Sequence, residues 1–357
     1  MSVSELSILD LHAVDPETSG NILQGILDAV RESVIIVDSS MRVTASNAAA
    51  YSAFARQKGA LEMRRLSEVI RDADLHLAFQ SAIESSELSE VRLEFVGSDR
   101  RSYDVRVAPI DLNGSRSAVG VFYDVTQIER LERVRQEFLS NVSHELRTPL
   151  TSIMAFVETL EDGAIDDKDN NRRFLGVIRR NAERMHALIS DILELSMIES
   201  GTISLNLQQA NLCSVVDEVF ASLAAKAAMR EITLINSVAP EVTVLADQFR
   251  LEQMLTNLID NAIKFNRPAG SVTVNFRREA GNNLISVADT GEGVLTEHLQ
   301  RIFERFYRAD RGRTREVGGT GLGLAIVKHL ARLHGGEVSA TSILRGGTTF
   351  LIELPAK

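Results

Sequence analysis

From residue 128 onward, the apolar residues of this chain recur at alternating steps of three and four, the spacing of a coiled-coil seam on an α-helix. The seam runs through Ile128, Leu131, Arg135, Phe138 and Val142, of which all but Arg135 are apolar. The pattern predicts one long helix that ends near Glu161, where the turn-forming segment 162–167 interrupts it. A long helix with one apolar face cannot fold alone and must pack against another element.

His144 lies on the polar side of this predicted helix. With about 100° of rotation per residue, the apolar side chains fall on the opposite side. Glu145 follows directly, and Thr148 shares the face of the histidine. Pro149 has no N–H and crowds the carbonyl of Glu145, so it predicts a bend just after the histidine. An exposed imidazole beside a carboxylate is suited to meeting another molecule.

A second amphipathic helix is predicted at 169–199, with Gly201 as its cap. The two helices would form an antiparallel hairpin whose apolar faces are only partly covered. A homodimeric four-helix bundle would cover the remainder. A monomeric hairpin packed on a neighbouring domain is the alternative, and the seam pattern favours the homodimer.

Length and composition set the wider frame. A chain of 357 residues predicts two or three domains. The net charge of −10 argues against nucleic acid as the main partner. The one cysteine, Cys213, cannot form an internal disulfide and suggests a reducing compartment. We find no apolar run of about 18 residues and no secretory signal, so we expect no transmembrane segment in this chain and a cytoplasmic location.

The N-terminal part reads as a polar tail at 1–20 and a mixed domain at 21–127. Two strands, short helices and three further strands are expected, an order that resembles a PAS sensor domain. The closing Asp124-Val125-Thr126 resembles the tripeptide that often ends such domains. His76 is a haem ligand or a structural residue, and a lone histidine favours the structural reading. Residues 21–127 hold no cysteine, which excludes a flavin–cysteine adduct.

Residues 203–357 alternate strands and helices and predict a separate α/β sandwich, after a hairpin region at 128–202. The helix after Asp247 carries a polar row of Asn257, Asn261 and Lys264 opposite its apolar stripe. Two amides and an ammonium suit Mg²⁺ and phosphates. Taken alone, the row favours a solvated polar face over a ligand site.

Two glycine motifs follow this helix. Asp289 ends an alternating strand and can accept a hydrogen bond from an exocyclic amine such as that of adenine, while Gly291 and Gly293 permit close approach of the backbone. By itself this is also an ordinary turn. A second glycine-rich turn at 318–323 opens onto an apolar helix and presents free N–H groups to phosphate. The pair at 335–336 and the segment 346–350 read mainly as turn chemistry.

Together these motifs resemble the sensor histidine kinases of bacterial two-component systems. Five boxes occur in the family's order over residues 128–357: the phosphoacceptor box around His144, the asparagine box at 257–266, the first glycine box at 289–293, the phenylalanine box at 303–308, and the second glycine box at 319–324. The segment 158–164 also resembles the phosphate-regulon branch. The implied fold is multidomain α+β: a PAS-like domain, a dimeric helical hairpin and an ATPase domain of the GHKL (Bergerat) type.

The resemblance implies ATP and Mg²⁺ as cofactors. Asn261 would coordinate Mg²⁺, Asn257 and Lys264 would lie near the phosphates, Asp289 would hold the adenine amine, and Phe265 would pack near the base. Relatives often have tyrosine and threonine where Phe265 and Asn266 stand, so this chain lacks the phenol hydroxyl of that tyrosine. Residues 303–319 would form a lid over ATP. The remaining implied nucleotide contacts are Gly291, Gly293, Arg308, Gly319, Thr320, Gly321, Leu322 and Gly323, with Arg313 and Arg315 as further candidates.

The implied reaction transfers the γ-phosphoryl group of ATP to His144 and then to an aspartate of a response regulator. Glu145 would bond to the other ring nitrogen, and Thr148 would orient water when the protein acts as a phosphatase of the regulator. The alternatives are a nucleotide-binding module without autophosphorylation, a GHKL ATPase of the chaperone or mismatch-repair type, and an anti-sigma serine kinase. The last two lack the hairpin that carries His144.

Overall fold

The computed structural model describes residues 25–54, 61–95, 100–112, 114–167, 170–309 and 319–356. The chain divides into two compact units, with the boundary between Glu137 and Phe138, and each unit is described by itself. The predicted tail at 1–20 lies outside the described residues. Among the helices in these ranges, none combines the length and the apolar character needed to cross a bilayer.

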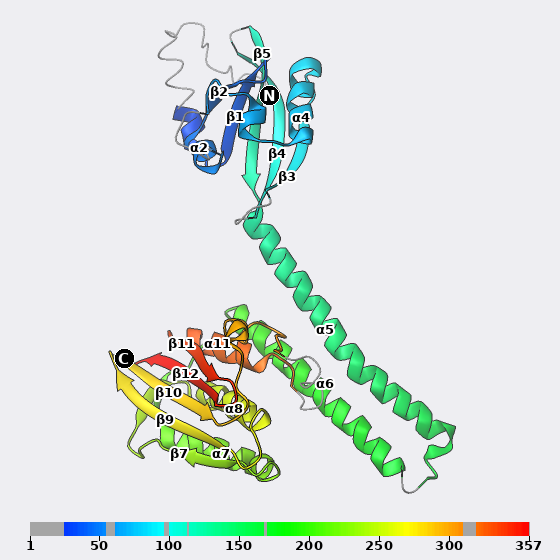
Figure 1. The fold of residues 1–357 in the computed structure, drawn as a ribbon, viewed down its shortest axis with the longest axis vertical. Coiled ribbons are helices and arrows are strands. Elements are labelled where there is room, and N and C mark those ends of the chain that lie inside the picture. Colours follow the sequence, from blue (N-terminus) through cyan, green and yellow to red (C-terminus); the bar gives the residue numbers. More distant parts are fainter. Residues whose placement is uncertain are drawn as a thin grey trace, which may run out of the picture. The chain divides into compact units, whose positions relative to one another are not determined.

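The first unit is built on a five-stranded antiparallel sheet with the strand order β2-β1-β5-β4-β3 (Figure 1). Its strands and helices follow the predicted order of two strands, short helices and three strands. They are β1 (Ser33–Asp38), β2 (Val43–Ser46), α2 (Ala48–Phe54), α3 (Leu66–Val69), α4 (Ala73–Ser85), β3 (Ser89–Phe95), β4 (Arg101–Leu112) and β5 (Ser115–Asp124).

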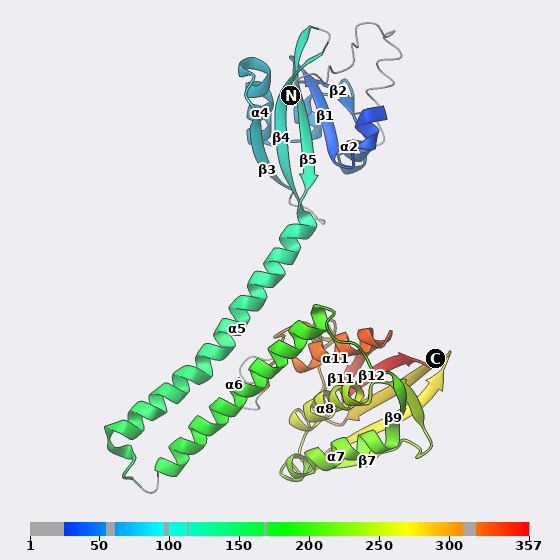
Figure 2. The same ribbon diagram turned by 180° about the vertical axis from the view of Figure 1, so that it is seen from behind.

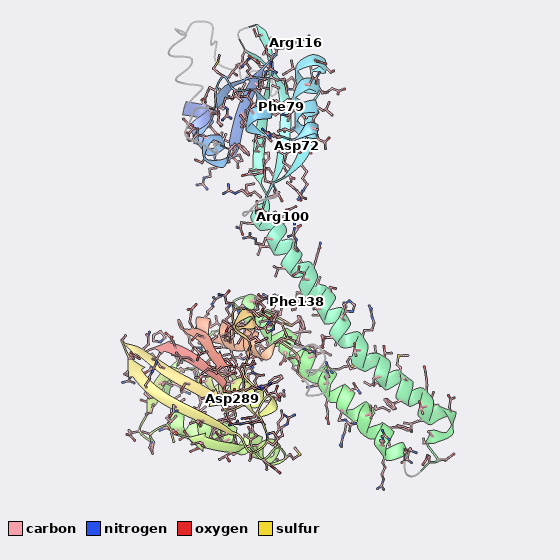
Figure 3. All side chains as sticks on the ribbon, viewed as in Figure 1. Asp72, Phe79, Arg100, Arg116, Phe138 and Asp289 are labelled. Atoms are coloured by element: carbon pink, nitrogen blue, oxygen red, sulfur yellow. The ribbon has the colours of Figure 1, made fainter. Side chains whose placement is uncertain are left out.

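Local chemistry explains the packing of α4 on this sheet. Asp72 caps the helix, because its side chain accepts a hydrogen bond from Leu75 N at 2.8 Å. Phe79, which is fully buried, lies against Gly120 of β5, where a Cβ atom would come within 2.5 Å of the phenyl ring. Figure 3 labels Asp72 and Phe79. The aromatic rings of Phe54 and Phe122, 5.0 Å apart, belong to the same core.

The predicted closing tripeptide joins the sheet to the helix that follows it. Val125 N donates to the carbonyl of Ser102 at 3.0 Å, and Ser102 N donates to Thr126 Oγ1 at 3.0 Å. Asp124 Oδ1 accepts from Thr126 N at 2.9 Å. These bonds fix the first turn of the helix to β4. His76 shows the structural role expected of it, since its Nε2 lies 3.0 Å from the carbonyl oxygen of Ile70.

The hairpin consists of α5 (Thr126–Thr159), a π-helical turn η2 (Leu160–Ala164) and α6 (Asn171–Glu199). Gly163 reverses the chain with a φ of +110°. The rings of Phe156 and Phe174 lie 5.4 Å apart across the hairpin. The predicted pair of long helices is therefore present. The helix α5 stays helical on both sides of Pro149, and the predicted bend stays a prediction.

Much of the apolar surface of the hairpin is exposed in the single chain. Within the second unit, large apolar side chains that are at least one third exposed are Leu139, Leu150, Met154 and Val157 of α5, and Leu175, Ile189, Leu193 and Met197 of α6. Large apolar side chains exposed in this number along two helices are typical of a contact surface.

The remainder of the second unit is an α/β sandwich. Its main sheet has the order β11-β12-β10-β9-β7, in which only the β7–β9 pair is parallel, and β6 pairs with β8. Figures 1 and 2 show α7 and α8 on one face of the main sheet. The elements are β6 (Gln208–Asn211), α7 (Leu212–Ala228), β7 (Thr233–Asn236), β8 (Thr243–Ala246), α8 (Gln248–Lys264), β9 (Ser271–Glu279), β10 (Asn282–Asp289), α9 (Thr296–Leu299), α11 (Gly323–Leu333), β11 (Glu337–Ile343) and β12 (Gly347–Pro355).

The apolar stripe of α8 forms the centre of this core. Asp247 caps the helix by accepting from Arg250 N at 3.1 Å. Every residue of the predicted stripe is buried: Leu251, Met254, Leu255, Leu258, Ile259, Ala262 and Ile263. The same hydrophobic cluster includes Leu188, Leu195 and Ile198 of α6. The C-terminal half of α6 therefore packs against the sandwich.

Candidate active site

The polar row of α8 lies on the face that the core leaves open. Asn257, Asn261 and Lys264 are all half-buried. Neither asparagine side chain forms a hydrogen bond with the part of the chain that the structure describes. Gly323 approaches this face closely, since a Cβ atom there would lie 3.2 Å from Asn257 Oδ1. The start of α11 thus faces the amide of Asn257, which is available to a ligand.

Lys264 is held by Asp260, one turn earlier on α8, with an Nζ–Oδ2 distance of 2.6 Å. The other carboxylate oxygen of Asp260 pairs with Lys226 of α7. Burial by itself would raise the pKa of the Asp260 carboxyl, but Lys264 and Lys226 outweigh it and hold the pKa below its usual value. Two ammonium groups therefore share one carboxylate beside the open face of α8.

Asp289 stands at the end of β10 with one side of its carboxylate engaged. Oδ1 accepts hydrogen bonds from Gly291 N at 2.8 Å and from Thr348 N at 3.2 Å. Oδ2 accepts none from the described residues. Burial raises the pKa of the Asp289 carboxyl, and the two backbone N–H groups oppose that rise. The carboxylate is thus fixed in orientation, with one oxygen left for a donor such as an exocyclic amine.

Two glycines make this orientation possible. A Cβ atom on Gly291 would lie 2.4 Å from the carbonyl oxygen of Phe265, and one on Gly347 would lie 1.9 Å from that of Asp289. The sequence predicts only a turn around Gly347 and Thr348, whereas in the structure Thr348 N also contacts Asp289. Only the pairing of β10 with β12 brings them together, and no local sequence signal reports that pairing.

The second glycine-rich turn leads into α11. Gly321 accepts a hydrogen bond from Phe306 N at 2.9 Å through its carbonyl, and Leu322 is fully buried. Thr320 Oγ1 accepts from Leu322 N at 3.2 Å and donates to Asp191 Oδ2 of α6 at 2.6 Å. No described atom lies within 4 Å of the place where a Cβ atom on Gly319 would stand. The turn is thus directed toward the open face of α8 and contacts α6.

Further predicted contacts lie around the same face. Phe265 is 42% exposed at the end of α8, so its ring is accessible. Gly293 packs on the strand opposite, because a Cβ atom there would lie 2.2 Å from the carbonyl oxygen of Ile343. The predicted lid residues Arg313 and Arg315 lie outside the described residues.

His144 and Thr148 are both exposed on α5, as the helical pattern predicts. Thr148 Oγ1 donates to the carbonyl oxygen of His144 at 3.2 Å. The imidazole makes no hydrogen bond with the residues that the structure describes. The ring is therefore accessible to a phosphoryl donor and to a partner protein.

Glu145 does not meet the expectation that it bonds to the ring of His144. Its Oε2 instead lies 3.1 Å from Arg184 Nη2 of α6 and 3.1 Å from Arg308 Nη2. Arg308 also donates to the carbonyl of Gly319. The arginine predicted to touch phosphate is thus directed to the carboxylate beside His144 in this structure. The permanent charge of the Arg184 and Arg308 guanidinium groups explains the preference, because charge-assisted hydrogen bonds to a carboxylate are among the strongest in proteins.

The donor set fits a magnesium ion only in part. Among the described residues, no group of three or more His, Cys, Asp or Glu side chains could hold a metal. The two free amides of α8 supply oxygen ligands that suit Mg²⁺, but too few to surround it. An ion at this face would need phosphate oxygens and water as its other ligands.

Family models match three successive segments of the chain. Residues 27–130 match the PAS fold, residues 134–201 match the His Kinase A (phospho-acceptor) domain, and residues 246–357 match the histidine kinase-, DNA gyrase B- and HSP90-like ATPase. The phosphoacceptor model includes His144, and the ATPase model includes Asn261 and Asp289. The chain therefore belongs to the family of sensor histidine kinases.

Curated relatives of this chain are named as a sensor histidine kinase and as a sensor protein. Sensor histidine kinase WalK of Bacillus subtilis (strain 168) is 38% identical over 241 residues, which is 67% of this chain and 39% of WalK. Sensor protein SrrB of Staphylococcus aureus (strain MRSA252) is 27% identical over 350 residues, which is 97% of this chain and 58% of SrrB. The chain thus spans between two fifths and three fifths of the length of these relatives.

Solved histidine kinase structures share the fold. The histidine kinase ThkA in complex with response regulator protein TrrA superposes with a TM-score of 0.52 at 23% identity, covering 93% of this chain and 98% of that one. The Acinetobacter baumannii histidine kinase AdeS gives a TM-score of 0.51 at 24% identity, covering 60% of this chain and 98% of that one. At these identities the likeness concerns the fold.

Proposed function

We propose that this chain is an ATP-dependent protein-histidine kinase that phosphorylates its own His144 and passes the phosphoryl group to an aspartate of a response regulator. The observation that carries the proposal is Asp289, which two backbone N–H groups hold with one carboxylate oxygen left for an amine. The ATPase family model that spans this residue supports ATP as the nucleotide. The exposed imidazole of His144 supplies the acceptor.

Each candidate residue receives a role that its position supports. Asp289 would accept from the adenine amine, with Phe265 against the base. Asn261 would coordinate Mg²⁺, while Asn257 and Lys264 would face the phosphates. The glycine-rich turn of residues 319–323 would present its N–H groups to the phosphates. When bound, Mg²⁺ offsets the negative charge of the transferring group.

The chemistry at His144 requires a neutral ring nitrogen to attack the γ-phosphorus in line with the leaving oxygen. The other ring nitrogen keeps its proton, and a carboxylate beside it would stabilise the cationic ring that forms. Glu145 is the carboxylate available for that task. It would have to leave Arg184 and Arg308 first, so autophosphorylation would use an arrangement of α5 and α6 different from the present one.

Incubation with γ-labelled ATP and Mg²⁺ tests this function. The protein should acquire label that is stable in alkali and labile in acid, as a phosphoramidate is. The His144→Gln variant should acquire none while retaining nucleotide binding. Label of the same acid lability on His144→Gln would refute the assignment of the acceptor. The partner is tested by adding purified receiver domains and following loss of label from the kinase.

A second activity, dephosphorylation of the regulator, is favoured by Thr148. Its hydroxyl lies on the exposed face of His144, and its donation to the carbonyl of His144 leaves the oxygen lone pairs for a water molecule. Thr148→Ala should lower the rate of regulator dephosphorylation at least tenfold and leave autophosphorylation nearly unchanged, because His144 and the ATP site are untouched. Equal dephosphorylation rates for the variant and the parent protein would exclude this role.

We further propose a homodimer in which the exposed apolar residues of α5 and α6 form a four-helix bundle. The proposed domains are a PAS-like sensor domain at 21–127, a dimerisation and phosphotransfer region at 128–202, and an ATP-binding domain at 203–357. Sedimentation equilibrium checks the assembly: twice the monomer mass at micromolar concentration is expected. A monomer mass throughout would favour a monomeric hairpin packed on the neighbouring domain instead. The cytoplasmic location expected from the sequence stays a prediction.

A further inference from the structure

The carboxylate of Asp191 reaches into the candidate phosphate site. Asp191 belongs to α6, yet its Oδ2 accepts the hydroxyl proton of Thr320, in the glycine-rich turn, at 2.6 Å. Its charge also interacts favourably with that of Lys264 at the end of α8. Thr320 and Lys264 come from two of the boxes that would bind the phosphates of ATP. An anionic group of the protein thus lies on residues suited to an anionic ligand.

The rest of α6 holds this carboxylate in place. Leu188 and Leu195, on either side of Asp191, are 3% and 1% exposed and belong to the core of the sandwich. Glu194 pairs with Arg250 and accepts from Gln253, both on α8. At the end of α6, Glu199 pairs with Arg305 and lies 3.4 Å from His329 Nε2. The contact of Asp191 is therefore part of a packed interface between α6 and the sandwich.

The raised pKa of the Asp191 carboxyl shows that its charged form is disfavoured in this position. Burial raises the pKa of its carboxyl, the hydrogen bond from Thr320 lowers it, Glu194 raises it and Lys264 lowers it, with a net rise. Burial disfavours the charge of this carboxylate, and of the described residues only a hydroxyl and a lysine hold it in place. An anion with more charge can therefore displace it.

We propose that Asp191 occupies the place of a nucleotide phosphate, so that docking of α6 on the sandwich and binding of ATP exclude each other. The inference rests on the proposed function, because it concerns the same ATP site. Thr320 can donate its single hydroxyl proton either to Asp191 or to a phosphate oxygen, but not to both at once. The carboxylate and the phosphates would also repel each other in a partly buried site.

The docked arrangement also withdraws Arg308 from the nucleotide. Its guanidinium pairs with Glu145 on α5 and donates to the carbonyl of Gly319. Both helices of the hairpin therefore engage groups that ATP would use. Linkage is reciprocal, so any signal that moves α6 away from the turn must raise the affinity for ATP, and ATP must favour the undocked arrangement by the same factor.

Nucleotide affinity measured by calorimetry tests this exclusion. The full chain carrying His144→Gln, which cannot be phosphorylated, serves as the parent, with Mg²⁺ and ATP as the titrant. Asp191→Ala should lower the dissociation constant about tenfold, the factor expected from removing one competing hydrogen bond to a charged group. Glu183→Ala on the same helix is the matched control, since the one ion pair of Glu183 with a described residue is to the exposed Arg179 at 3.8 Å. The control should bind ATP like the parent.

A second variant separates docking from a local effect. Glu194→Ala weakens the same interface without touching the turn, and it should also bind ATP more tightly than the parent. Circular dichroism verifies that each variant is folded. Unchanged or weaker binding by Asp191→Ala, with normal binding by the parent, would overturn the inference. Failure of the parent and every variant to bind ATP would instead refute the proposed function, and the exclusion with it.

Discussion

Replacing Asp289 by asparagine would test the nucleotide site most directly. The two side chains have the same shape, so the change alters one atom and its hydrogens. Gly291 N and Thr348 N both point at Oδ1, and both are donors. The asparagine must therefore keep its oxygen at that position and place its NH₂ group where Oδ2 now stands. A donor would then face the donor amine of adenine.

The size of the effect follows from this forced orientation. A hydrogen bond to a charged group contributes about 1.5–3 kcal/mol. Because about 1.4 kcal/mol corresponds to a factor of ten, Asp289→Asn should weaken ATP binding roughly 10- to 150-fold. The new donor suits the carbonyl oxygen at the corresponding position of guanine. GTP binding should therefore be weakened less than ATP binding, or strengthened, so the ratio of ATP affinity to GTP affinity should fall.

The same substitution should not weaken the fold. Burial raises the pKa of Asp289, so the folded protein binds a proton more tightly there than the unfolded chain does. The stability of the parent protein consequently declines as the pH rises from the ordinary carboxyl pKa through the raised one, and stays lowered above it. Asparagine has no such dependence. At neutral pH the variant should be as stable as the parent or more stable.

Calorimetric titration with ATP and with GTP, together with thermal unfolding at pH 7, measures both expectations. Glu279→Gln, at the exposed end of β9, makes the same chemical change away from the site and should alter neither quantity. ATP binding by Asp289→Asn within twofold of the parent would refute the reasoning. A loss of stability equal to the loss of binding would also refute it, because the effect would then be structural.

Two further substitutions test the surroundings of the site. Gly347→Ala adds a Cβ atom 1.9 Å from the carbonyl oxygen of Asp289, at a φ of +100°. The variant should lose about 3 kcal/mol of unfolding free energy and should also bind ATP more weakly. A urea midpoint unchanged from the parent would contradict this. Lys226→Met removes one of the two cations that lower the pKa of Asp260. A lowered carboxyl pKa stabilises the folded protein, and this stability is lost as the pH falls through that pKa. The variant should therefore lose less than about 1 kcal/mol of unfolding free energy at pH 7, and progressively less below the ordinary carboxyl pKa. A difference in urea unfolding between variant and parent that grows in acid would contradict this.

The fold of the second unit was largely readable from periodicity. The stripe of α8 is buried residue for residue as predicted, because a helix packed on one side leaves a regular record in its sequence. The exposed position of His144 followed from the same geometry. The roles assigned to the boxes came from a family resemblance. The family models match the segments that hold the boxes, and the roles themselves stay predictions.

The errors concern long-range partners. Glu145 was expected on the ring of His144, but Arg184 and Arg308, which stand 39 and 163 residues away in the sequence, take its carboxylate instead. Thr348 was read as part of a turn, although β12 brings its N–H to Asp289. Local patterns specify which face a side chain occupies. They do not specify which charged group from another element reaches that face.

The sequence by itself therefore determined the helices, the buried stripes, the exposed histidine and the order of the boxes, since each depends on residues a few positions apart. Only the tertiary structure decided how the carboxylates are used. Asp289 is oriented by a strand that joins the sheet later in the chain, and Asp191 is delivered by a helix from the hairpin to Thr320. Hydrogen bonds and ion pairs of this kind act over a few ångströms in space, and the separation of their partners along the chain leaves no period for a sequence to show.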